Sequence, residues 1–267
     1  MVHWQFSFKS CPSRYRERSN EEYRIVKRGL CMEGSEEKKT VGILGGMGPE
    51  ATVELLQRIL EATPAQRDQD HIHVLVDSNP KIPDRTSAIF GTGESPLPLM
   101  VAAAKNLERV GAGCIIIPCN TAHHWLAELR DAVSIPIVDM IGETAACVAV
   151  YRPSLHTIGF LSTAGTLRTG LYQGALTEKG LRVMSPSEEE EETVMHAIER
   201  IKAGDHTVRR EVIAVAQHLV ERGAEGIIPG CTELSLVVQR SDFSCPLFDP
   251  LSILASHVVQ WATNGEG

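Results

Sequence analysis

The sequence predicts an α/β protein with two pseudo-symmetric domains, each a mostly parallel sheet flanked by helices, and an active site in the cleft between them. Two observations lead to this prediction. Short apolar runs alternate with amphipathic stretches of helical period along most of the 267 residues, a pattern typical of parallel sheets covered on both faces. In addition, one pattern of helix, Gly-Ala, apolar strand and cysteine occurs twice, which indicates two related halves.

The first half contains four expected strands and three expected helices. The stretch from Glu50 to Ala62 places its apolar residues at helical spacing, and two later stretches follow the same rule. A loop rich in Pro and Asp is expected over 78–86. The expected strands are 41–44, 73–76, 115–118 and 135–138, and the expected helices are 50–62, 97–110 and 122–132.

The second half repeats this alternation. Its acidic run, Glu188–Glu192, follows Ser187. Since Ser is a favoured N-cap residue and acidic side chains suit the first turn of a helix, we interpret this run as a helix start. The expected strands are 156–161, 181–184, 226–229 and 246–248, and the expected helices are 166–179, 188–202, 208–222 and 251–261.

The domain boundaries follow from these elements. We expect residues 40–140 together with 249–263 to form the first domain, and residues 141–248 to form the second. Residues 1–39 are polar and lack a steady period, which predicts a flexible N-terminal extension, with Met32 as an alternative start. This extension has nine Lys/Arg and six Asp/Glu, so it carries +3 while the rest of the chain carries −11 of the total −8.

Composition excludes several function classes. An acidic body argues against nucleic acid as a partner, because neutralising phosphates requires clustered Lys and Arg. No run approaches the roughly 20 apolar residues that a membrane helix needs, and no apolar secretory signal is present. We therefore expect a cytoplasmic protein. Its seven cysteines show no disulfide framework, so we expect free thiols.

The repeat singles out two cysteines. When Gly111-Ala112 is placed over Gly223-Ala224, Cys119 falls on Cys231 without a gap, and the residues two places further on also correspond. Each cysteine follows an apolar strand, and open α/β sheets build their sites at the carboxyl ends of strands. A helix is expected after each cysteine, and its positive end would lower the thiol pKa.

Two thiols at equivalent places across a cleft fit racemisation of an amino acid. One thiolate removes the α-proton from one face while the other thiol delivers a proton to the opposite face. Charge that develops on the α-carboxylate must be stabilised by preorganised donors. Asn120, Thr121 and Thr232, which adjoin the cysteines, are suited to this.

Two other kinds of site are disfavoured. The turn Gly45–Gly48 lacks the spacing of a dinucleotide-binding or phosphate-binding loop, so we expect a tight turn whose backbone approaches a small carboxylate. Cys119 and His123 are four residues apart, but a zinc site needs three or four converging ligands, and we expect no metal. His123 is expected to cap or line the site, and His124 to lie on the surface.

The chain from residue 41 to residue 261 resembles the aspartate/glutamate racemase superfamily, and most closely its aspartate racemase branch. Four motifs in the same order carry this resemblance. They are Gly45-Gly46-Met47-Gly48-Pro49-Glu50-Ala51-Thr52, Asn79-Pro80 with Ile82-Pro83-Asp84-Arg85-Thr86, Pro118-Cys119-Asn120-Thr121-Ala122-His123, and Gly230-Cys231-Thr232-Glu233.

The resemblance implies a cofactor-independent enzyme without pyridoxal phosphate or metal, usually a homodimer, whose substrate is an acidic amino acid. It implies that Cys119 and Cys231 are the two acid/base residues, and that Arg85 and Lys202 hold the side-chain carboxylate. The residues expected at the substrate are Met47, Gly48, Arg85, Asn120, Thr121, Thr163, Lys202, Thr232 and Glu233.

Several alternatives stay open at this point. Aspartate is the expected substrate, but glutamate differs by one methylene, which is worth only about 1–3 kcal/mol in a pocket. Related activities are a broad-specificity amino-acid racemase, a hydantoin racemase or a maleate-type isomerase. A non-catalytic protein that binds a small carboxylate is the remaining alternative, and the presence of both cysteines argues against it.

Overall fold

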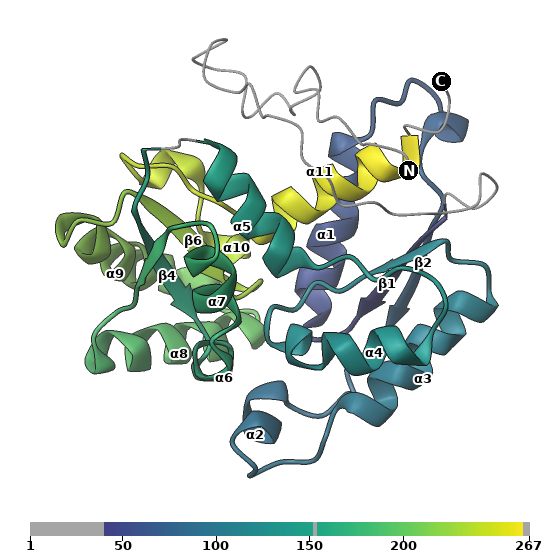
Figure 1. Cartoon of the computed structure of the whole chain (residues 1–267), viewed down its shortest axis with the longest axis horizontal. Helices are drawn as coiled ribbons and strands as arrows, with labels where there is room; N and C mark the ends of the chain where they lie inside the picture. The colour runs from purple at the N-terminus through teal and green to yellow at the C-terminus, as the bar shows by residue number, and fades with distance from the viewer. Residues whose placement is uncertain (1–39, 152–153, 264–267) are drawn as a thin grey trace.

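The computed structural model describes residues 40–151 and 154–263, and the expected extension over residues 1–39 lies outside them. Figure 1 shows two lobes side by side, one containing β1 and β2 and the other containing β4 and β6. Each lobe has a parallel three-stranded sheet flanked by helices. The predicted α/β class with two related halves is therefore confirmed.

The first sheet has the strand order β2-β1-β3. One face packs against α3 and α4, and the other against α1 and α11, because alternate residues of β1 point to opposite faces. Its strands are β1 (Val41–Gly45), β2 (Val74–Ser78) and β3 (Cys114–Ile116). Its helices are α1 (Pro49–Ala62), α3 (Leu97–Arg109), α4 (Leu126–Ala132) and α11 (Pro250–Thr263).

The second sheet has the equivalent order β5-β4-β6. Helices α8 and α9 pack on one face, and α5 and α7 on the other. Its strands are β4 (Thr157–Ser162), β5 (Arg182–Met184) and β6 (Gly226–Gly230). Its helices are α5 (Met140–Tyr151), α6 (Ala164–Thr169), α7 (Leu171–Thr177), α8 (Glu188–Lys202) and α9 (Arg209–Glu221). The N-terminus of α8 is capped by Ser187 in a capping box with Glu190, as the acidic run predicts.

The repeat extends to the packing between sheet and helix. A Cβ on Gly42 of β1 would lie 3.3 Å from the Cβ of Leu107 and 3.0 Å from that of Ala112. Gly159, its equivalent in β4, would meet the equivalent Leu219 and Ala224, each at 3.2 Å. Only glycine lets each strand approach its helix this closely. The two halves thus share their close contacts as well as their strand order.

Several expected elements differ from the structure. The strands expected at 135–138 and 246–248 are reduced to single bridges, Ile115 with Ile137 and Ile227 with Leu247. The helix expected at 122–132 begins as a 3-10 helix over Thr121–Trp125. The helix expected at 166–179 is interrupted at Gly170, which has a φ of +67°. Short 3-10 helices also lie at Asp68–Asp70, His206–Val208 and Arg240–Asp242.

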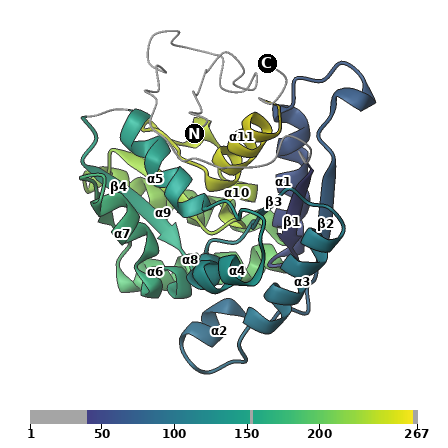
Figure 2. The ribbon, with the colours of Figure 1, turned by 45° about the vertical axis from the view of Figure 1, so that its right-hand side comes forward.

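Three helices were not predicted. They are α2 (Arg85–Ile89), α5, and the single turn α10 (Leu234–Val237). Helix α2 begins at the end of the loop expected over 78–86 and continues beyond it, and it extends from the first half toward α6 (Figure 2). A Cβ on Gly165 of α6 would lie 2.9 Å from the Cα of Thr86, so glycine permits this contact between the halves. No helix in the described part of the chain is long and apolar enough to cross a bilayer.

Candidate active site

A pocket lies between the two halves, near the carboxyl ends of their strands. Its empty volume, open mouth included, is about 280 Å³. Its walls come from both halves of the chain and include both repeat-related cysteines. The lining residues are Met47, Asp84, Arg85, Thr86, Cys119, Asn120, Thr121, Thr163, Lys202, Cys231, Thr232 and Glu233.

This lining contains ten of the eleven residues that the sequence singled out. The eleventh, Gly48, does not line the pocket but donates its backbone N–H to Oε1 of Glu233 at 3.2 Å. The turn 45–48 therefore contacts a carboxylate of the protein itself, and its approach to a small carboxylate ligand stays a prediction. Sequence reasoning did not single out Asp84 and Thr86, although both stand beside Arg85 in a quoted motif.

Cys231 lies directly after β6, and its thiol is bonded to a carboxylate. The side chain is 6% exposed, and Sγ donates to Oε2 of Glu233 at 3.0 Å. Burial, followed by the negative charge of Glu233, raises the pKa of Cys231, and the Lys202 ammonium offsets this only in part. The expectation that a helix N-terminus lowers this pKa is wrong. Helix α10 has only four residues, and burial and the neighbouring carboxylate dominate.

Cys119 lies three residues beyond β3, and His123 holds its backbone. Nε2 of His123 accepts from the backbone N–H of Met140 at 3.2 Å, so Nδ1 carries the proton and donates to the carbonyl of Cys119 at 2.9 Å. Burial lowers the pKa of His123, which keeps the ring neutral. His123 is not part of the pocket lining, contrary to expectation, because both of its ring nitrogens are engaged by the backbone. His124 is exposed as predicted.

Three threonine hydroxyls form a closed ring between the halves. Thr121 Oγ1 lies 3.1 Å from Thr163 Oγ1 and 2.7 Å from Thr166 Oγ1, and the last two lie 3.0 Å apart. Thr163 also caps α6 by accepting from the N–H of Thr166 at 3.1 Å. Thr121 belongs to the first half and the other two to the second. The ring therefore fixes two pocket-lining hydroxyls relative to each other.

Two donors in the pocket wall are buried without a protein partner. Asn120 accepts a bond from Tyr172 through Oδ1, and its Nδ2 has no partner within the described residues. Arg85 donates through Nη1 to the carbonyls of Ile82 and Pro83 and through Nη2 to that of Met47, while its Nε has none. A buried donor without a partner costs about 1–3 kcal/mol. Both donors are thus suited to an anionic ligand.

The pocket lining carries charged groups of both signs. Arg85 is buried, whereas Lys202, at the end of α8, is exposed although it lines the pocket. Partial burial in the pocket wall acts to lower the pKa of Lys202, but the negative charge of Glu233, and that of Cys231 in its thiolate form, outweigh this and raise the pKa. Asp84 caps α2 and, despite partial burial, has a lowered pKa because Ser87 donates two bonds to it. The Lys202 side chain is therefore cationic at neutral pH.

Comparison with known proteins identifies the family. The sequence profile of the Asp/Glu/hydantoin racemases matches residues 44–258. The chain belongs to this family. It is thereby an isomerase of the racemase class, and racemases of this family act on small molecules.

The relatives within the racemase family include several specificities. The chain is 27% identical to the broad specificity amino-acid racemase RacX of Bacillus subtilis, with 82% of this chain and 96% of that protein covered. The solved structure of the Picrophilus torridus aspartate racemase is 30% identical over 84% of this chain and 94% of that one, with a TM-score of 0.77. An aspartate racemase homologue from Pyrococcus horikoshii is 27% identical over 84% and 99%, with a TM-score of 0.68.

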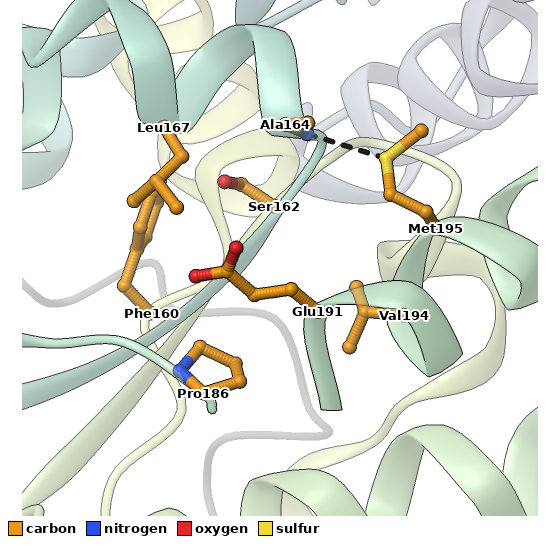
Figure 3. Close-up of a pocket in the computed structure, with 8 residues that line it drawn as sticks. All are labelled: Phe160, Ser162, Ala164, Leu167, Pro186, Glu191, Val194 and Met195. Carbon is orange, nitrogen blue, oxygen red and sulfur yellow. Dashed lines mark hydrogen bonds between the residues drawn. The ribbon is translucent and has the colours of Figure 1, made fainter. Parts of the chain in front are cut away.

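A second pocket of this racemase-family chain lies beside β4 (Figure 3). It is lined mainly by apolar side chains, all from the second half. The carboxylate of Glu191 lies among Phe160, Ser162 and Pro186, and burial raises its pKa. Since this pocket contains neither of the repeat-related cysteines, it is not the candidate active site. No group of three or more His, Cys, Asp or Glu side chains placed to hold a metal is found over residues 40–151 and 154–263.

Proposed function

We propose that this chain is a cofactor-independent racemase of an acidic amino acid, aspartate before glutamate, which works by two-base 1,1-proton transfer. The observation that carries the proposal is that Cys119 and Cys231, equivalent in the repeat, line one pocket from opposite halves. Proton transfer at both faces of one carbon requires two such groups. An enzyme with a single nucleophilic cysteine would not require the second cysteine at the equivalent position.

In the proposed reaction, one thiolate takes the α-proton and the opposite thiol donates a proton to the other face. The α-carboxylate is bound by Nδ2 of Asn120, by nearby backbone amides, and by the hydroxyls of Thr121, Thr163 and Thr232, which rotate from their protein partners to donate to it. As the proton leaves, negative charge spreads onto this carboxylate. Nδ2 of Asn120 is already oriented by the protein and stabilises that charge without reorganisation. The buried, unpartnered Nδ2 supports this assignment.

The side-chain carboxylate of the substrate is assigned to Arg85 and Lys202. Two observations support this. Nε of Arg85 is buried without a partner, and Lys202 has a raised pKa and lines the same pocket. A dicarboxylate offers one carboxylate to Asn120 and the other to these cations. Among the solved relatives, the Picrophilus torridus aspartate racemase favours aspartate as this dicarboxylate.

A second candidate is a racemase of broader specificity. The observation in its favour is the match to the broad specificity racemase of Bacillus subtilis, which extends over 96% of that protein. Asp84 and Glu233 also place negative charge on the pocket lining, so the lining does not select for acidic side chains by charge alone.

Homodimer assembly, the expected domain boundaries and a cytoplasmic location stay predictions.

The deciding experiment uses the purified full chain in deuterated water, with a chelator and without pyridoxal phosphate. L-aspartate and L-glutamate are supplied separately, and the α-proton NMR signal and the optical rotation are followed together. We expect loss of both, faster with aspartate. Cys245→Ala, which removes a thiol of the core outside the pocket, should behave as the parent protein. Absence of exchange with both substrates would contradict the proposal, and other amino acids, hydantoins and maleate would be tested next.

A further inference from the structure

The surroundings of the two cysteines break the pseudo-symmetry of the pocket. Thr121 and Glu233 occupy equivalent positions, each two residues after its cysteine. The Thr121 hydroxyl is bonded to Thr163 and Thr166. The Glu233 carboxylate instead accepts from the Cys231 thiol at 3.0 Å. Only one of the two thiols is therefore paired with an acidic group at this position.

The Glu233 carboxylate is held in place by hydrogen bonds from other residues. Glu233 is 3% exposed. Its Oε1 accepts from the Gly48 N–H at 3.2 Å, and its Oε2 accepts the Cys231 thiol and, more weakly, the Thr232 hydroxyl at 3.4 Å. Because a carboxylic acid is intrinsically much more acidic than a thiol, the shared proton lies on sulfur.

We infer that Glu233 is a positioning residue that keeps Cys231 protonated in the resting enzyme, so that Cys231 starts as the acid and Cys119 as the base. This inference rests on the proposed function. It gives Glu233 a role beyond the expected substrate binding, since both of its oxygens accept bonds from the protein. The Thr232 hydroxyl has one proton, which it shares between Oε2 of Glu233 at 3.4 Å and the carbonyl of Pro118, in the first half, at 3.2 Å.

The proton balance defines two forms of the free enzyme. In the resting form, the Cys119 thiolate takes the α-proton of one enantiomer and the Cys231 thiol gives its proton to the opposite face. The product leaves Cys119 as a thiol and Cys231 as a thiolate. The other enantiomer requires this second form, which the negative charge of Glu233 disfavours. Restoring the resting form moves one proton from Cys119 to Cys231.

The two directions of racemisation must therefore differ in a specific way. Enantiomers have equal free energies, so the equilibrium constant is one and kcat/KM must be equal in both directions. Unequal stability of the two enzyme forms then appears as unequal kcat, with KM unequal by the same ratio. A residue that only supports the fold would change both directions alike and leave that ratio unaltered.

The first test measures the proton on Cys231 directly and needs no substrate. In a Cys119→Ser background, iodoacetamide is applied across a pH series, and alkylation is quantified on the tryptic peptide 223–240, in which Cys231 is the only cysteine. Glu233→Gln removes the charge and keeps the shape. We expect the pH of half-maximal alkylation rate to fall by about one unit or more, because a nearby like charge is removed. Glu233→Asp, which restores the charge, should return it toward the parent value.

Glu191→Gln is the matched control, since it neutralises a carboxylate in the second pocket. It should leave the midpoint unchanged. An unchanged or higher midpoint in Glu233→Gln would overturn the inference, as would a midpoint in Glu233→Asp no higher than in Glu233→Gln. If Glu233→Gln fails to fold, Glu233→Asp still provides a test. A midpoint in Glu233→Asp about one pH unit or more below that of the parent protein would then overturn the inference, because this variant keeps the charge.

The second test uses both enantiomers of the preferred substrate with intact Cys119. Glu233→Gln should move the ratio of the two kcat values toward one, by up to about tenfold if the alkylation midpoint of Cys231 falls by one pH unit. The ratio of the two KM values should change by the same factor. A ratio equal to that of the parent protein would overturn the inference. Failure of the proposed function is distinguishable, because the parent protein would then show no exchange with any substrate while the alkylation midpoints still report on the Cys231–Glu233 pair.

Discussion

The hydroxyl of Tyr172 donates to Oδ1 of Asn120 at 2.7 Å, and this contact orients an amide that lines the pocket. Tyr172 is fully buried in the core of the second half, where its ring lies 4.6 Å from that of Phe160. Burial raises the pKa of Tyr172, so the phenol remains a donor. Since Oδ1 is occupied, Nδ2 is the group of Asn120 left for a ligand.

Tyr172→Phe should impair catalysis as well as stability. The ring and its packing on Phe160 remain, but the amide of Asn120 loses the contact that orients it. Losing one hydrogen-bond partner at a buried group costs about 1–3 kcal/mol in the free energy of unfolding. A loss of 1.4 kcal/mol in transition-state stabilisation corresponds to about tenfold in kcat/KM, and we expect a decrease of that size. An unaltered kcat/KM would show that Asn120 needs no support from Tyr172.

The threonine ring predicts a contrast between two variants at Thr166. Thr166→Val keeps the shape but removes a fully buried hydroxyl that joins Thr121 to Thr163. We expect a loss of about 1–3 kcal/mol in the free energy of unfolding and a decrease in kcat/KM. Thr166→Ser keeps the hydroxyl and should retain more activity than the valine variant, although it loses a methyl group worth about 1 kcal/mol. Equal activity of the two variants would contradict a role for the ring. Urea unfolding and steady-state kinetics measure both effects.

Helices with a regular apolar stripe could be predicted from sequence, and those without one could not. Helix α1 alternates buried and exposed residues at helical spacing. Helix α5 is apolar on most sides because it packs between the second sheet and α11 (Figure 1), so it lacks the polar face that marks a surface helix. Helix α2 has only five residues and depends on its Asp84 cap and on contact with α6.

The lining of the site could be predicted more fully than its internal bonding. The repeat placed Cys119 and Cys231 at strand ends because the spacing from Gly111 and Gly223 is the same in both halves. These glycines have φ values of +100° and +103° and end equivalent helices. The bond from Cys231 to Glu233, in contrast, depends on side-chain conformation and on Gly48, which lies 185 residues away in sequence. No local pattern contains that information.

His123 should make stability depend on pH. Burial lowers its pKa in the folded state below the value of about 6.5 that it has when unfolded. As pH falls below about 6.5, the unfolded chain binds a proton that the folded chain does not, so the free energy of unfolding decreases, by at most about 1.4 kcal/mol per pH unit. Above that pH the contribution is fully present. Urea unfolding at pH 7.5, 6.5 and 5.5 measures the slope.

The variant His123→Asn should be less stable at pH 7.5 but less sensitive to acid. The difference from the parent protein should narrow as pH decreases. His124→Asn is the matched control, because His124 is exposed, and it should keep the parental slope. If His123→Asn and the parent protein lose stability in parallel, another group is responsible for the acid sensitivity.

Arg58 joins α1 to the last helix and to α10. It forms an ion pair with Asp249, donates to Ser252 Oγ at 2.8 Å, and donates to the Ser235 carbonyl at 3.0 Å. The Arg58 and Asp249 side chains are only 14% and 6% exposed. Removing one partner of a buried ion pair costs about 3–5 kcal/mol. We therefore expect Arg58→Ala to decrease the free energy of unfolding, measured with urea, by about 3 kcal/mol. Arg67→Ala breaks the exposed pair with Asp70 and should lose far less. Similar losses in the two variants would contradict this assignment.

The two-base proposal makes its sharpest prediction for the single cysteine variants. Cys119→Ala and Cys231→Ala should each reduce racemisation by about 10²–10⁴-fold, the usual contribution of one acid/base group. Each variant keeps one thiol, so each should still exchange the α-proton of one enantiomer with solvent and return that same enantiomer. The two variants should therefore select opposite enantiomers in deuterated water, as followed by NMR on D- and L-substrate separately. Exchange of both enantiomers by one variant, or racemisation at the parental rate, would show that one residue serves both faces.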